Sequence, residues 1–198
     1  MEERHSQAWA WVQGRLTPSR LEHTRGVVKA ATELARRFGA DEEKADLAAI
    51  LHDAAKNLGG PQLLSLAHQE GIIVDIVQQQ APDLLHGPVA AALARRELNE
   101  RDEDVLRAVA IHTTGAPGMS ALDKVIYLAD YIEPGRSFPG VDQLREAAAH
   151  SLDRAVLLAM DGALRYVVDR GWLIHPLTVE ARNWLLGQGK LSGEGGPG

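Results

Sequence analysis

The chain has 198 residues, 45% of them hydrophobic and 24% charged, which is enough to bury a core and predicts a single domain. Its apolar runs are far shorter than the roughly 20 residues of a membrane-spanning helix and no signal-type block opens the chain, so we expect a cytoplasmic protein without membrane contact. A net charge of −6 argues against nucleic-acid binding, and the absence of cysteine excludes disulfides, thiolate metal sites and cysteine nucleophiles.

Apolar residues recur at helical spacing along nearly the whole chain. The first predicted helix begins with Thr17 as its N-cap and Pro18 at the first helical position, and it ends at Gly39. Further helices are predicted, in chain order, over residues 41–60, 61–71, 82–98, 102–115, 120–136, 141–171 and 177–189.

One segment does not fit this pattern clearly. Residues 71–77, GIIVDIV, are short and β-branched enough to be either strand or helix. No other segment alternates like a strand. We therefore expect an all-α fold: a compact, single-domain helical bundle over residues 1–186, followed by a flexible Gly-rich tail over 187–198.

Several polar residues fall on faces that should point inward. His23 lies at helical offsets from Val27, Ala30 and Leu34, which predicts that it faces the core. Asp130 follows Ile126 by one turn, and an ionised carboxylate in apolar surroundings is costly unless it is paired or bound to a metal. His52 and His112 follow the same pattern on their own helices.

Each of these residues alone has an ordinary structural explanation. We assign such structural roles to His5, His68, His150 and His175. The others form a larger set of four histidines and two aspartates, spread over five predicted helical segments and mostly near their ends: His23, His52, Asp53, His86, His112 and Asp130. A helical bundle can gather such positions into one pocket.

The order of these residues is specific. The series is His23, HDAAK from His52 to Lys56, HG at His86, HTTG from His112 and ADYIEPGR from Ala129 to Arg136. An isolated His-Asp pair is a weak signal, but this series resembles the HD-domain superfamily, specifically its YqeK family of symmetrical bis(5'-nucleosyl)-tetraphosphatases. The resemblance covers roughly residues 17–170.

This resemblance implies an all-α bundle that holds two metal ions, typically iron. The implied ligands are His23, His52, Asp53 and Asp130 for one ion, and His86 and His112 for the other, with Asp53 bridging. Neighbouring helical residues point about 100° apart, so His52 and Asp53 can reach one ion from two directions. Six nitrogen and oxygen ligands leave coordination positions open, which suits octahedral iron or manganese better than a closed zinc site.

Two such metals can activate water for attack on phosphorus, so hydrolysis of a phosphoanhydride is the natural reaction. We expect Asp53, Lys56 and Arg136 to act in catalysis, the last two by neutralising charge on the polyphosphate. Thr113 and Thr114 are expected to bind substrate together with these two cations. The resemblance implies that the substrate is diadenosine tetraphosphate and that the products are two molecules of ADP.

The position of the cut depends on how the nucleotide is held. The loop GRSFPGVD is our candidate for setting it, since Phe138 and Pro139 offer an apolar wall next to Arg136. Two other functions remain open: hydrolysis of another nucleotide, such as a cyclic phosphodiester or a nucleoside triphosphate, and non-catalytic nucleotide sensing. The complete ligand set argues against a sensor. The expected partner is a small nucleotide, and a homodimer is left open.

Overall fold

The computed structural model describes residues 2–191, and all regular secondary structure in that range is helical. The expected all-α fold is therefore confirmed. The elements are α1 (Glu2–Gln13), α2 (Pro18–Phe38), α3 (Glu42–Leu51), α4 (Gly60–Gln69), α5 (Ile76–Gln80), the 3₁₀ helix η1 (Pro82–Leu85), α6 (His86–Glu97), α7 (Glu103–Ile111), α8 (Ala121–Ile132), α9 (Val141–His150), α10 (Leu152–Asp169) and α11 (Pro176–Leu191).

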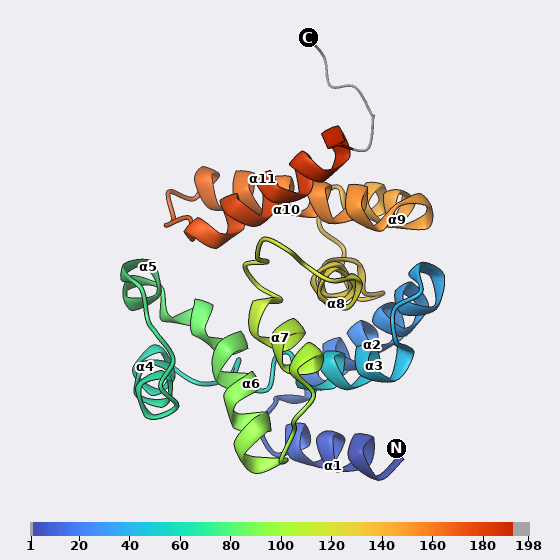
Figure 1. Cartoon of the computed structure of the whole chain (residues 1–198). Helices are drawn as coiled ribbons and strands as arrows, with labels where there is room; N and C mark the ends of the chain where they lie inside the picture. Colours follow the sequence, from blue (N-terminus) through green and yellow to red (C-terminus); the bar gives the residue numbers. More distant parts are fainter. Residues whose placement is uncertain (1, 192–198) are drawn as a thin grey trace.

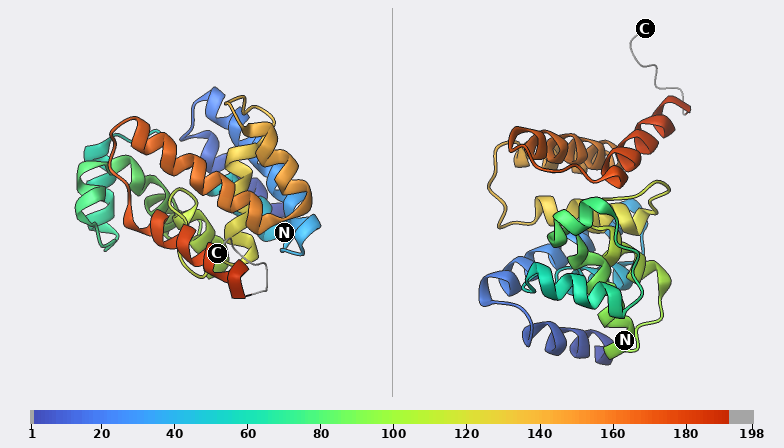
Figure 2. Two further views of the ribbon diagram at one scale, coloured as in Figure 1. Left: turned by 90° about the horizontal axis from the view of Figure 1, so that it is seen from above. Right: turned by 90° about the vertical axis from the view of Figure 1, so that its left-hand side faces the viewer.

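The helices form a bundle around α3, α7 and α8. Helix α2 packs against α3 and α8, and α7 packs against α6, α8 and α3. Helices α9, α10 and α11 form a separate layer that covers α8, while α1 lies on the opposite side beneath α3 (Figure 1; Figure 2, right). Helices α4 and α5 lie on the same side of α6 (left in Figure 1), where α4 packs against α6 and η1 and α5 packs against η1. None of the described helices has the length and apolar character needed to cross a membrane.

The predicted start and end of the first long helix are confirmed. Pro18 is the first residue of α2, and Gly39 ends it in the left-handed conformation with a φ of 71°. Thr17 holds the N-cap position, but its side chain makes no capping hydrogen bond. Asp41 does cap α3, because its carboxylate accepts hydrogen bonds from the backbone N–H groups of Glu43 and Lys44.

The predicted helix over 41–60 is shorter than expected. Helix α3 ends at Leu51, and the chain continues in tight turns in which Ala54 N donates to Leu51 O and Lys56 N donates to Asp53 O. Alanine at positions 54 and 55 favours helix locally, but both residues are buried here and tertiary packing overrides that preference. His52 and Asp53 therefore lie in a turn directly after a helix.

Two other predicted helices are also interrupted. The helix expected over 141–171 is two helices, because Ser151 is extended (φ −152°, ψ 121°) and its hydroxyl accepts a hydrogen bond from Arg154 N at the start of α10. Serine is a strong N-cap residue, so it ends one helix and begins the next. The segment over 82–98 begins as the 3₁₀ helix η1, and α6 starts only at His86.

The helices predicted over 102–115 and 120–136 end earlier, at Ile111 and Ile132, and further differences occur at the two ends and at 71–77. Helix α1 was not predicted, although Ala8 and Val12 are fully buried in it. Residues 71–75 are not a strand, and α5 starts immediately after them. Helix α11 continues to Leu191, so residues 187–191 are helical, since one glycine costs a helix only about 1 kcal/mol. The rest of the expected tail, 192–198, lies outside the described residues.

Candidate metal centre

The six predicted ligands come together where five elements meet. His23 lies in α2, His52 and Asp53 in the turn after α3, His86 at the start of α6, His112 directly after α7, and Asp130 near the end of α8. His52, Asp53, His86 and His112 are buried, while His23 and Asp130 are half-buried. The structure therefore places residues from 23 to 130 around one point.

Helix ends orient three of the four histidines. Each donates its Nδ1 proton to the carbonyl oxygen three residues earlier: His52 to Ala49 O at 2.7 Å, His86 to Asp83 O at 2.5 Å and His112 to Val109 O at 2.7 Å. The last carbonyls of a helix have no partner in a following turn, so Ala49 O and Val109 O can accept these bonds, while Asp83 O accepts the backbone N–H of His86 as well. A proton held on Nδ1 leaves Nε2 with a lone pair, which is the form that binds a metal.

The carboxylate of Asp53 lies among these three Nε2 atoms. Its Oδ1 is 3.3 Å from His86 Nε2 and 3.7 Å from His112 Nε2, while its Oδ2 is 3.7 Å from His52 Nε2. The two oxygens thus face different histidines, as a bridging carboxylate requires. His52 Nε2 is buried and has no hydrogen-bond partner, and such an atom calls for an explanation.

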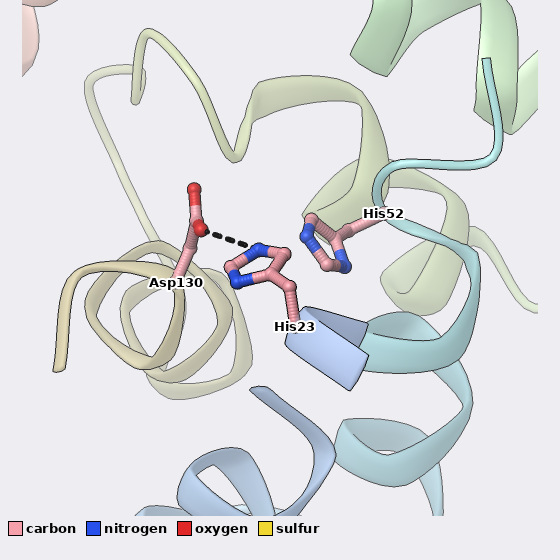
Figure 3. A group of neighbouring side chains, drawn as sticks. All are labelled: His23, His52 and Asp130. Carbon is pink, nitrogen blue, oxygen red and sulfur yellow. Dashed lines mark ion pairs between the residues drawn. The ribbon is translucent and has the colours of Figure 1, made fainter. Parts of the chain in front are cut away.

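A second group lies beside the first. His23 Nε2 is 3.0 Å from Asp130 Oδ1, and the His23 ring lies between Asp130 and His52 (Figure 3). Ligand atoms of His23, His52 and Asp130 lie within 4.8 Å of one another, as do those of His52, Asp53 and His112. His52 belongs to both groups. The orphaned Nε2 and the imidazole and carboxylate donors fit one metal ion or a close pair.

The buried histidines are electrostatically suited to ligation. Burial lowers the pKa of His52 to about 4, and burial also lowers the pKa of His86. Burial alone would raise the pKa of Asp53, but His52, His112 and His86 together hold it well below its usual value. The lowered pKa values of His52 and His86 favour neutral rings at neutral pH and that of Asp53 favours an ionised carboxylate, which are the protonation states that metals require.

The interaction between His23 and Asp130 raises the pKa of the histidine and lowers the pKa of the aspartate, so each favours the charged form of the other. Burial lowers the pKa of His23, but its bonds to Asp130 and Glu133 outweigh burial and raise the pKa above the usual 6.5. Burial would raise the pKa of Asp130, yet His23, His52 and Arg136 hold it far below the usual value. A metal at this position must displace a proton from His23 Nε2.

An open cavity of about 420 Å³ leads to this cluster. The residues that line it are Ser19, Arg20, His23, Asp53, Lys56, Asp130 and Arg136. Three of the seven are cations, so the cavity combines metal-binding groups with positive charge. Phosphate oxygens are attracted by that combination.

The predicted substrate-binding residues differ in their surroundings. Lys56 Nζ lies 3.2 Å from His86 Nε2, and Thr113 Oγ1 lies 3.2 Å from the same atom. Arg136 donates from Nη2 to Asp130 Oδ1 at 2.5 Å and from Nε to the Asp130 carbonyl at 2.8 Å. Thr114 instead donates its hydroxyl to Gly115 O at 3.0 Å and is buried. Of the two threonines, only Thr113 contacts the cluster.

The histidines expected to be structural do not line the cavity. His68 and His150 are exposed. His5 Nε2 lies 3.1 Å from Asp46 Oδ2, and His175 Nε2 lies 2.8 Å from Asp75 Oδ2.

Three of the described residues at the site were not predicted: Ser19, which lines the cavity, Arg20 and Glu133. Arg20 lies one turn before His23 on the same face of α2, with Nη1 3.5 Å from Asp53 Oδ2. The spacing of three residues could have indicated it. Glu133 is buried and its Oε1 lies 3.1 Å from His23 Nδ1. Its only signal in the sequence is its place between Asp130 and Arg136.

The fold and the site together define an all-helical protein with a cluster of His and Asp side chains, suited to metal binding, at a cationic cavity. Comparison with known proteins agrees. A model of the HD domain matches residues 20–135. The chain is 42% identical over 180 residues to the symmetrical bis(5'-nucleosyl)-tetraphosphatase of Bacillus subtilis, covering 91% of this chain and 96% of that one. It is 33% identical to the protein of the same name from Staphylococcus aureus, covering 86% and 88%.

Among solved structures, a predicted HD superfamily hydrolase involved in NAD metabolism, from Clostridium acetobutylicum, matches with a TM-score of 0.90 and 40% identity. The match covers 92% of this chain and 97% of that one. The chain belongs to the HD-domain family, in the branch of the symmetrical bis(5'-nucleosyl)-tetraphosphatases. Members of this family are metal-dependent hydrolases, which agrees with the clusters described above.

Proposed function

We propose that this chain hydrolyses diadenosine tetraphosphate symmetrically to two molecules of ADP. One observation carries the proposal most directly: Asp53 and the Nε2 atoms around it lie at a cavity that is also lined by Arg20, Lys56 and Arg136. The substrate class comes from the relatives, whose names specify this activity.

We propose two bound metal ions, with iron as the first choice and manganese as the second. His23, His52, Asp53 and Asp130 would hold one, and His86 and His112 would hold the other with Asp53 shared. Two close groups of ligand atoms support this number, and nitrogen and oxygen donors without thiolate suit these metals. When bound, the metals act as Lewis acids on the polyphosphate oxygens and lower the pKa of the attacking water.

The remaining roles fall to side chains around the cavity. Lys56 and Arg136 would neutralise charge that develops on the polyphosphate, and Arg20, whose Nη1 lies 3.5 Å from Asp53 Oδ2, would contact a phosphate there. Thr113 would donate a hydrogen bond near His86. Thr114 remains a candidate only if its bond to Gly115 O breaks on substrate binding.

The choice of which phosphoanhydride bond is cleaved depends on how the nucleotide is held. Symmetrical cleavage requires a β phosphorus at the metal pair, so the nucleotide must be held at a fixed distance from it. The loop 133–140 follows α8 directly, and Phe138 in it has 38% of its surface exposed. We propose that Phe138 and Pro139 contact a ribose or base while Arg136 holds a phosphate.

A panel of nucleotides with product identification tests this function. Diadenosine tetraphosphate in ¹⁸O-labelled water should give only ADP, with one labelled ADP per turnover, and activity should vanish on metal removal. An ATP and AMP product pair would contradict the symmetrical cut. Faster turnover of a cyclic phosphodiester or nucleoside triphosphate would favour the second function, and tight binding without any product would favour a sensor.

A further inference from the structure

His23 differs from the other three histidines in how it can be oriented. They follow helix ends, where the carbonyl three residues earlier accepts the Nδ1 proton, but His23 lies inside α2. The carbonyls one turn before it are already used within the helix, as Arg20 O also accepts the hydroxyl of Thr24. His23 therefore needs an acceptor from another element, and Glu133 at the end of α8 supplies it.

The surroundings of Glu133 fit that task. Its side chain is buried, with Oε1 3.1 Å from His23 Nδ1 and Oε2 accepting the Gly135 N–H at 2.5 Å. Each carboxylate oxygen thus has its own donor. Gly26, three residues after His23 on α2, leaves the space for this carboxylate, because a Cβ at that position would overlap Glu133 Oε2.

Arg145 holds the main chain that carries Glu133. From α9, its guanidinium donates to Ile132 O at 3.2 Å, Glu133 O at 3.0 Å and Arg136 O at 2.9 Å, and a fourth bond joins it to Asp142. A planar guanidinium can bind several carbonyls at once, whereas an ammonium cannot match this geometry. The loop after α8 is thereby fixed relative to His23.

We propose that Glu133 is a positioning residue for the metal centre. It keeps a proton on His23 Nδ1, so that Nε2 is the nitrogen that faces Asp130 and the metal, and Arg145 fixes the backbone from which Glu133 acts. The inference rests on the metal centre of the proposed function.

The first test compares two matched carboxylates. Glu133 and Glu100 are each 5% exposed and each accepts a backbone N–H, but Glu100 pairs with Arg4 and does not line the cavity. Glu133→Gln has one acceptor oxygen for two donors, so Mn²⁺ affinity measured by calorimetry should fall about 10- to 100-fold, as for other orienting partners of metal ligands. Glu100→Gln should bind Mn²⁺ like the unmodified protein.

If Glu133→Gln folds like Glu100→Gln and keeps full Mn²⁺ affinity, the inference is overturned. Should Glu133→Gln not fold, the unmodified protein still decides the matter. With diamagnetic Zn²⁺ bound, ¹⁵N spectra of the histidines should show His23 protonated at Nδ1 and coordinated through Nε2. Coordination through Nδ1 would overturn the inference, whereas failure of the unmodified protein to bind any metal would instead overturn the proposed function.

Discussion

Asp53 is surrounded by more of the candidate site than any other ligand. Its oxygens face His52, His86 and His112, and Arg20 Nη1 lies 3.5 Å from Oδ2. A buried carboxylate with these neighbours stays ionised, and Arg20 is the fixed positive charge beside it. Its removal should therefore affect both metal binding and turnover.

Asp53→Asn keeps the shape of the side chain but removes its charge. We expect it to lose bound metal and to lower kcat/KM by at least about a hundredfold, because the proposed bridge between two metal ions would be removed. Metal content and initial rates measure these effects. Asp83→Asn is the control, since Asp83 contributes its backbone carbonyl to His86 while its side chain is exposed. Full metal content in Asp53→Asn would refute the assignment.

Lys56→Ala and Arg136→Ala should differ in a way that the structure specifies. Both should lower kcat/KM by about ten- to a thousandfold through loss of charge stabilisation. Their effects on metal affinity should arise at different candidate ligands, because Lys56 lies 3.2 Å from His86 Nε2 whereas Arg136 pairs with Asp130. Steady-state kinetics and metal titration separate the two effects. Near-normal turnover in both variants would leave these residues with structural roles only.

At the scale of elements, the close approach of α6 and α7 places His86 beside His112. Gly87 makes it possible: a Cβ there would lie 2.9 Å from Ala110 O, 3.0 Å from Val109 O and 3.2 Å from His112 Nδ1. Two of these atoms form the hydrogen bond that orients His112. The glycine after His86 is thus a requirement of the site as well as of the packing.

Gly87→Ala should force α6 and α7 apart. We expect it to destabilise the protein by about 1–3 kcal/mol through overpacking and to weaken metal binding. Gly162→Ala in α10 is a matched control, because nothing lies within 4 Å of its added Cβ; it should raise stability by about 0.5–1 kcal/mol. Denaturant unfolding measures both. If the two variants unfold alike, the close contact does not limit the packing.

Much of the fold could be predicted from the sequence because its signals are local. Pro18, Gly39 and Asp41 mark helix ends through their own backbone and side-chain chemistry. The end of α3 at Leu51 could not be predicted, since the following alanines favour helix and only packing against other elements forms the turn. Ser151 could have been read as a break, but apolar spacing continues across it.

In the candidate site, too, residues with a local sequence signal could be predicted, whereas residues defined by tertiary contacts could not. The six ligands could be proposed because histidine and aspartate are rare on apolar faces and appear here in a specific order. Glu133 and Arg145 could not, because charged residues near helix ends are common and their contacts join α2, α8 and α9, which only the tertiary structure brings together. Thr114 is the opposite case: it was predicted as a substrate contact because it lies in the HTTG motif, but its hydroxyl donates to Gly115 O.

For the whole molecule, the ligands connect α2, α3, α6, α7 and α8. Bound metal should therefore stabilise the entire bundle. At a free metal concentration 100 times the Kd, the gain is about 2.7 kcal/mol, which corresponds to a Tm increase of roughly 5–10 °C for a chain of this size. Calorimetric scans with and without Mn²⁺ measure it, and Asp53→Asn should show no shift. An equal shift in that variant would place the bound metal elsewhere.

The hydrogen bonds from His52 and His112 to Ala49 O and Val109 O lie in the parts of helices that open most readily in solution. Opening the last turn of α3 or α7 releases a metal ligand, and a bound metal in turn resists that opening. Amide hydrogens of residues 52–56 and 112–115 should thus exchange with deuterium more slowly once Mn²⁺ is added, while those of α10 change little. Metal occupancy could then be measured without any substrate, from the rate at which the backbone amides of these two segments exchange with water.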